Sequence, residues 1–338
     1  MRILDELPTA EALRAEMPVP STVAEARRRQ TEEIRRILSG ASAKWLLVVG
    51  PCSVERKDAA LAWAEKLARL QETVRERALL VPRMYTSKPR TTGDGYKGML
   101  HQPDLGREEN LAAGLRAARD LHLSVARESG LCAADELLYP ELADCFQDAL
   151  AYMVVGARSV EDQQHRLVAS GLEIPVGMKN PMNGDLGVML HSIQSAQHGH
   201  HFAFNGHEVE SDGNLFAHAI LRGYLDGNGQ PHPNYHYESL LRLHASYSAR
   251  GLPNMAVLVD CNHHNSGKQY LEQIRIAMEV KKLREYDGRI REMVKGLMIE
   301  SYLEDGRQNF PGKVFGQSIT DACLGWEKTE RLIREIVE

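Results

Sequence analysis

Residues Leu79-Leu-Val-Pro-Arg83-Met-Tyr-Thr-Ser-Lys88-Pro-Arg90-Thr91-Thr92 decide how this chain is interpreted. The apolar run Leu79–Val81 predicts a buried strand, and the polar residues after it predict a loop at its carboxyl end. Three cations, Arg83, Lys88 and Arg90, gather there. A solvated charge run is normally mixed in sign, whereas Arg and Lys together supply charge-assisted hydrogen bonds to phosphate or carboxylate. The segment therefore predicts a binding site for an anionic substrate at the end of a strand.

Short apolar runs of this kind alternate with amphipathic helical stretches along most of the chain. We expect eight strands, near Trp45–Val49, Leu79–Met84, Leu131–Ala134, Met153–Val155, Ile174–Met178, His201–Phe204, Ala256–Val259 and Gly296–Ile299. We expect helices at Asp58–Arg77, Glu108–Glu128, Val160–Ser170, Leu186–Gln197, Ser266–Arg284 and Thr320–Val337. Buried strands that alternate with helices indicate parallel βα units. Eight units favour a closed (β/α)8 TIM barrel over an open doubly wound sheet, and the fourth and sixth strands are the weakest assignments.

Two segments fall outside this repeat. Residues 1–43 are charged and contain a helical stretch, Val23–Leu38, that ends at Ser39-Gly40, so we expect an N-terminal extension before a catalytic barrel domain of residues 44–338. The stretch Asn205–Tyr237 is too long for an ordinary βα loop, which predicts an inserted hairpin after the sixth strand.

Composition excludes several classes of protein. Hydrophobic residues make up 43% of the chain and charged residues 26%, as in globular proteins with a sizeable core. The net charge of −5 argues against a nucleic-acid binder. No apolar run approaches the roughly 18 residues of a membrane span, and the N-terminus lacks a secretory signal. Five cysteines, an odd number without a CxxC pair, predict reduced thiols and a cytoplasmic location.

Ionisable residues fall at the same end of nearly every expected strand. They follow the strands as Cys52, the Arg83–Thr92 cluster, Asp135-Glu136, Ala157-Arg158, Lys179-Asn180, Asp260–His263 and Glu300. Chance placement would scatter them. Because catalytic groups of a TIM barrel lie at the carboxyl ends of its strands, this pattern predicts one active site there.

Three of these positions, Cys52, His263 and Glu300, form a plausible set of ligands for a divalent metal together with Asp321. A mixed sulfur, nitrogen and oxygen shell favours Mn²⁺, Fe²⁺, Co²⁺ or Zn²⁺ over Mg²⁺. Three of the four residues also have a simpler explanation or a rival, whereas Glu300 at the end of an apolar strand does not. Cys52 alone could be a small buried hydrophobe, His264 could replace its neighbour as the ligand, and Asp321 could be the N-cap of the last helix.

Further cations complete an anion pocket. Arg158 is placed at the start of a helix whose first turn could donate N–H groups to a phosphate, and Lys179 and Arg222 could close the same pocket. Taken alone, Arg222 would more simply be a surface arginine. The histidines at 198, 200, 201 and 207 lack regular ligand spacing and do not predict a metal site. No P-loop or GxGxxG motif is present.

These residues together resemble the class I 3-deoxy-D-arabino-heptulosonate 7-phosphate (DAHP) synthases, over the chain from about Thr22 onward. The matching motifs are Gly-Pro-Cys52-Ser, Lys88-Pro-Arg90-Thr-Thr, Gly-Ala157-Arg158-Ser-Val-Glu-Asp-Gln, Pro-Val-Gly-Met-Lys179-Asn, Ile-Leu-Arg222-Gly, Asp260-Cys-Asn-His263-His-Asn-Ser-Gly-Lys268, Met-Ile-Glu300-Ser and Ser-Ile-Thr-Asp321-Ala-Cys-Leu-Gly-Trp326. They run in the family's order, and their combination is highly specific.

The resemblance implies a (β/α)8 barrel that condenses phosphoenolpyruvate with erythrose 4-phosphate and releases phosphate, the first step of the shikimate pathway. By the same resemblance, the metal ligands are Cys52, His263, Glu300 and Asp321, and the catalytic residues are Arg83, Lys88, Lys179 and His263. The phosphate of phosphoenolpyruvate is expected to be bound by Arg158, Lys179 and Arg222, with Glu136 and Ala157 nearby. The aldose phosphate is expected to be bound by Arg90 and Thr91. A homo-oligomer, dimer or tetramer, is implied as well.

The chain also departs from the family pattern. Around His263 the family usually reads Phe-Ser-His-Ala-Asn-Ser, so Cys261, Asn262 and His264 are substitutions. The loop Gly93–Tyr96 is one residue longer than in the family pattern. An alternative function is therefore that of a homologue that uses a different aldose phosphate in secondary metabolism. A non-catalytic metabolite-binding relative is the third alternative. The hairpin region is short and acidic, and the N-terminal extension is abbreviated, so we expect little or no feedback inhibition by aromatic amino acids.

Overall fold

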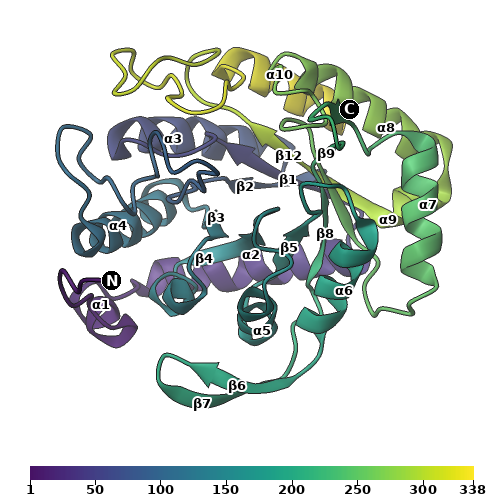
Figure 1. Ribbon diagram of the computed structural model, residues 1–338. Coiled ribbons are helices and arrows are strands. Elements are labelled where there is room, and N and C mark those ends of the chain that lie inside the picture. The colour runs from purple at the N-terminus through teal and green to yellow at the C-terminus, as the bar shows by residue number, and fades with distance from the viewer.

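The centre of the molecule is a barrel of eight short parallel strands, seen in a computed structural model that describes residues 1–338 (Figure 1). The strands are β1 (Trp45–Gly50), β2 (Ala78–Pro82), β3 (Ala133–Leu137), β4 (Leu150–Val155), β5 (Val176–Lys179), β8 (His218–Leu221), β11 (Val257–Asp260) and β12 (Val294–Glu300). They are hydrogen-bonded in the order β2-β1-β12-β11-β8-β5-β4-β3. The Met84 amide donates to the Ala134 carbonyl at 2.9 Å, which joins the two ends of that order. The predicted (β/α)8 fold is confirmed.

Amphipathic helices cover the outside of the barrel. They are α3 (Lys57–Val74), α4 (Leu111–Ser129), the short 3-10 helix η1 (Pro140–Cys145), α5 (Gln163–Gly171), α6 (Leu186–Gln197), α7 (Tyr237–Ser248), α8 (Glu272–Tyr286), α9 (Gly288–Met293) and α10 (Trp326–Val337). Asn110, Asp162 and Asp185 cap the starts of α4, α5 and α6, because each side chain accepts a hydrogen bond from an N–H group of the first turn. No helix combines the length and the apolar character that crossing a membrane requires.

The sixth barrel strand does not lie where the sequence suggested. Residues His200–Phe204 form β6, which pairs antiparallel with β7 (His207–Ser211) in a hairpin that stands away from the barrel at the bottom of Figure 1. The true sixth strand is β8, whose four residues are all buried, whereas β6 alternates between half-buried and exposed residues. The large hairpin therefore precedes the sixth barrel strand. A much smaller one, β9 (Tyr224–Leu225) with β10 (Pro231–His232), follows it.

Two helices precede the first strand, α1 (Ala10–Glu16) and α2 (Ser21–Ser39). The apolar face of α2, which includes Ile34 and Ile37, belongs to the same buried cluster as Leu46, Val48 and other side chains of the barrel strands. The Gln30 amide group both donates to and accepts from the backbone of Cys132, at 2.8 Å in each case. Helix α2 thus packs against the barrel core and leaves the carboxyl ends of the strands free for a site.

Candidate active site

The carboxyl ends of the strands surround a charged cavity of about 270 Å³. Every site residue predicted from the sequence lines it except Glu300, which is buried. The lining also includes Tyr85, Ser87, Asp94 and Lys268, for which no role in the site was expected, and His264, which was expected only as a rival metal ligand. Lys268 and His264 lie within the motif that runs from Asp260 to Lys268, so the resemblance to the family could have identified them as site residues. Asp94 belongs to the lengthened loop and had no such signal.

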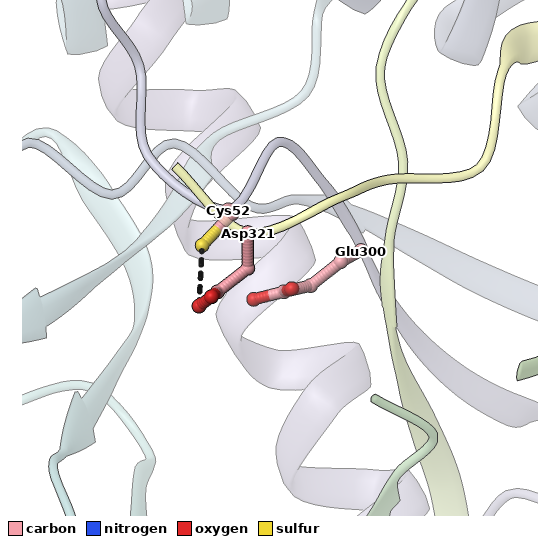
Figure 2. Close-up of side chains that lie close together, drawn as sticks. All are labelled: Cys52, Glu300 and Asp321. Carbon is pink, nitrogen blue, oxygen red and sulfur yellow. Dashed lines mark hydrogen bonds between the residues drawn. The ribbon is translucent and has the colours of Figure 1, made fainter. Parts of the chain in front are cut away.

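Cys52, Glu300 and Asp321 lie close together (Figure 2), and the first and last of them line this cavity. Cys52 follows β1, Glu300 ends β12, and Asp321 lies in the segment before α10. Their candidate ligand atoms are all within 4.8 Å of one another, and Cys52 Sγ lies 3.4 Å from Asp321 Oδ2. Asp321 is not a helix cap, because α10 begins at Trp326 with Gly325 as its N-cap. The simpler explanation of Asp321 is therefore wrong.

His263 adjoins this cluster through Glu300. Its Nε2 lies 3.7 Å from Glu300 Oε1, while its Nδ1 lies 2.7 Å from the buried Asp260 Oδ2. Burial by itself raises the pKa of Asp260, but His263 and the cations Lys179 and Arg222 hold that pKa below its ordinary value. A carboxylate on Nδ1 leaves Nε2 available, which is the usual arrangement of a metal-binding histidine. The rival residue His264 contacts Arg222 instead.

The chemistry of these donor atoms fits a divalent cation. Glu300 Oε1 is buried and accepts no hydrogen bond, although it lies 3.1 Å from Arg83 Nη2. Burial and the charge of Glu300 raise the pKa of the Cys52 thiol to about 12. The thiol therefore needs an additional positive charge to ionise, and a bound metal ion supplies such a charge.

Four cations of the cavity already have a carboxylate partner. Arg83 pairs with Glu300, Lys179 with Glu136 at 3.0 Å, and both Lys88 and Lys268 with Asp321 at 3.0 Å. Burial lowers the pKa of Lys88, but Cys52 and Asp321 outweigh it and raise that pKa above its ordinary value. The positive charge of each of these four side chains is thus paired with a carboxylate of the site.

The other three arginines of the cavity have only neutral partners. Arg90 Nε donates to the Tyr96 carbonyl at 2.8 Å, and Arg158 Nε donates to Thr91 Oγ1 at 2.9 Å. Arg222 Nη1 lies 3.0 Å from His264 Nδ1. Their positive charges are not neutralised by any carboxylate within 4 Å, which favours the binding of an anion from outside the protein.

The helix expected to start at Arg158 begins later. Arg158 lies in a turn, where Ser159 and Val160 donate to the Gly156 carbonyl, and α5 starts only at Gln163 with Asp162 as its cap. The expectation that helix N–H groups surround Arg158 is therefore wrong. The Arg158 side chain still lines the cavity and provides the positive charge itself.

The loop that carries Lys88 and Arg90 is anchored by Asp135. This buried carboxylate accepts from the Thr86 amide at 2.9 Å and from the Thr86 hydroxyl at 2.6 Å, and it lies 2.9 Å from His122 Nε2. Its neighbour Glu136 contacts Lys179 in the cavity instead. Side chains alternate along a strand, so Asp135 supports the loop while Glu136 belongs to the site.

Comparison with known proteins agrees with this geometry. The sequence profile of the DAHP synthetase I family matches residues 21–334. A phospho-2-dehydro-3-deoxyheptonate aldolase of Haemophilus influenzae is 35% identical, over 98% of this chain and 91% of its own length. The Phe-sensitive enzyme of that name from Escherichia coli is 36% identical, over 94% and 88%. The solved structure of the Francisella tularensis protein of that name superposes with a TM-score of 0.91 at 32% identity, covering 100% of this chain and 98% of that one. This chain belongs to the DAHP synthetase I family.

Proposed function

We propose that the chain is a metal-dependent DAHP synthase that joins phosphoenolpyruvate to erythrose 4-phosphate, the first step of aromatic amino acid biosynthesis. Family membership supports the reaction class. The assignment of the substrates rests on one observation: three arginines of the cavity have no carboxylate partner, whereas its other cations do. These arginines are available to bind two phosphorylated substrates. The remaining cations stay near the reacting groups through their carboxylate partners.

Arg158 and Arg222 would hold the phosphate of phosphoenolpyruvate, with Ala157 beside it, while Arg90 and Thr91 would hold the aldose phosphate. The contact between Arg158 Nε and Thr91 Oγ1 supports neighbouring subsites. Holding both polyanions in a reactive arrangement overcomes their mutual repulsion and the entropy of bringing them together.

Arg83, Lys88 and Lys179 would face the carboxylate and the reacting carbons of phosphoenolpyruvate. A divalent ion held by Cys52, His263, Glu300 and Asp321 would act as a Lewis acid on the aldehyde oxygen. The enol carbon then forms the new bond to the aldehyde carbon, water adds at C2, and the C–O bond to phosphate breaks. The permanently charged cations of the site stabilise the negative charge that moves during these steps.

A second candidate function is condensation with a different aldose phosphate. The lengthened loop Gly93–Tyr96 places Asp94 in the lining of the cavity, where a carboxylate can alter the choice of aldose. A purely binding relative is less well supported, because such a protein needs neither the metal-ligand set nor the lysines paired with it.

The five cysteines are all free, which supports a cytoplasmic enzyme. The exposed apolar side chains Ile3, Leu4 and Leu7 support burial of the N-terminal segment in a homo-oligomer.

Replacing Cys52 with Ser should weaken the binding of the metal and lower the rate. The serine oxygen is a harder ligand than a thiolate and does not ionise near neutral pH, so a borderline ion loses its best donor. Metal content after dialysis and the rate at limiting metal measure the effect. Cys132→Ser, at a buried cysteine outside the cavity, serves as the control. Full metal content and full rate in Cys52→Ser would show that the proposed metal shell is wrong.

Replacing Arg158 with Ala should raise the KM for phosphoenolpyruvate far more than the KM for the aldose phosphate, and Arg90→Ala should do the opposite. Removing one charged partner from a desolvated anion site typically costs about 2–5 kcal/mol. Initial rates with each substrate varied at saturating levels of the other separate the two effects. Equal changes of both Michaelis constants in both variants would overturn the assignment of the two subsites.

We also expect weak or no inhibition by phenylalanine, tyrosine or tryptophan. The hairpin offers apolar surface, because Phe202, Phe204 and Val209 line a cavity of about 140 Å³ beside η1 and α5. The charged residues of that cavity are Asp144 and Glu210, which would repel the carboxylate of a free amino acid, and no cation lines it. Initial rates with each amino acid at millimolar concentration test this, and strong inhibition by any of them would contradict it.

A further inference from the structure

Arg222 combines burial with the lack of a charged partner. Its side chain follows β8 and the residue is 4% exposed. Its Nη1 has two neighbours, His264 Nδ1 at 3.0 Å and the Met182 sulfur at 3.4 Å. A buried cation that lacks a carboxylate is costly unless its donors are satisfied. His264 supplies the stronger of the two acceptors, so the contact is significant for the placement of the guanidinium.

The direction of this hydrogen bond fixes the state of the imidazole. An arginine side chain can only donate, so His264 Nδ1 must accept, and the ring is then neutral with its proton on Nε2. A carboxylate in the same place would also orient Arg222. It would, however, cancel most of the charge that a phosphate needs, as Glu136 does for Lys179. A neutral acceptor orients the guanidinium and leaves its charge available.

The backbone around both residues is held firmly in place. The His264 amide donates to the Arg222 carbonyl at 3.1 Å, and the Arg222 amide donates to Asn180 Oδ1 at 2.9 Å. Asn265 Nδ2 donates to the carbonyls of Leu221 and Asp260 at 3.1 and 2.8 Å, which ties the loop after β11 to β8. His264 is therefore held in position by contacts that do not depend on its own ring.

We propose that His264 is a positioning residue of the phosphate subsite, which orients Arg222 through the hydrogen bond that its neutral ring accepts from the guanidinium. The inference rests on the proposed function, because it assumes that Arg222 binds the phosphate of phosphoenolpyruvate. The hydrogen-bonded chain from Asn180 to the Arg222 backbone, and from the Arg222 guanidinium to His264, gives the subsite a preformed geometry.

Three variants of His264 distinguish the effect of losing the Nδ1 acceptor from the effect of losing the rest of the imidazole ring. His264→Ala removes the acceptor and introduces the residue of the family pattern. His264→Asn keeps an acceptor near the position of Nδ1, whereas His264→Gln moves the amide toward the position of Nε2. A hydrogen bond to a charged group is worth roughly 1.5 kcal/mol at the lower end of its range, so we expect the Ala and Gln variants to raise the KM for phosphoenolpyruvate about ten-fold. The Asn variant should stay close to the parent, and kcat and the KM for the aldose phosphate should change less than about two-fold in all three.

Arg222→Ala and the double variant complete the experiment. If His264 acts through Arg222, adding His264→Ala to Arg222→Ala should raise the KM for phosphoenolpyruvate no further. His207→Ala, on the exposed hairpin, is the control, and thermal unfolding of every variant checks that the fold is intact.

The outcomes distinguish this inference from the proposed function. A raised KM in Arg222→Ala together with an unchanged KM in His264→Ala overturns the role of His264 alone. Additive effects in the double variant, or failure of Asn to restore the parent value, overturn it as well. An unchanged KM in Arg222→Ala overturns the phosphate subsite itself, and the role of His264 with it.

Discussion

The buried ion pair between Arg83 and Glu300 is the interaction on which the rest of the site depends. The two side chains lie 3.1 Å apart and are almost completely excluded from solvent. Arg83 also donates to the Pro51 and Cys52 carbonyls and stacks on the Tyr85 ring at 3.6 Å, and Glu300 accepts from Asn262. Removing either charge would leave the other buried and unpaired, which is strongly destabilising. The pair therefore fixes the ends of β1, β2 and β12 around the candidate metal ligands.

The cations of the cavity fall into two groups that differ in their partners. Lysines paired with carboxylates lie near Cys52 and Asp321, and arginines with neutral partners provide the unneutralised charge. The chain as a whole is acidic, with a net charge of −5, whereas seven lysines and arginines gather in this one cavity. Such an arrangement favours multiply charged anions over other ligands through local electrostatics alone.

The sequence predicted which residues gather around this cavity more completely than it predicted the strands. Ionisable residues at strand ends are read directly from the chain, and the structure places Cys52, Arg158 and Asp321 around one cavity. Strand six was misplaced because β6 is a run of histidines and phenylalanines that pairs locally, whereas β8 is only four residues long and is recognised by its burial. The contact of His264 with Arg222 joins two distant segments and no local pattern encodes it.

The most direct test of the account is phosphate release from phosphoenolpyruvate, measured with a panel of aldose phosphates before and after treatment with EDTA. The account predicts release that requires erythrose 4-phosphate, stops when the metal is removed, and returns when Mn²⁺, Fe²⁺, Co²⁺ or Zn²⁺ is added back. A full rate in the metal-free protein would contradict the metal site. No release with any aldose phosphate, from a folded and metal-loaded protein, would contradict the proposed reaction.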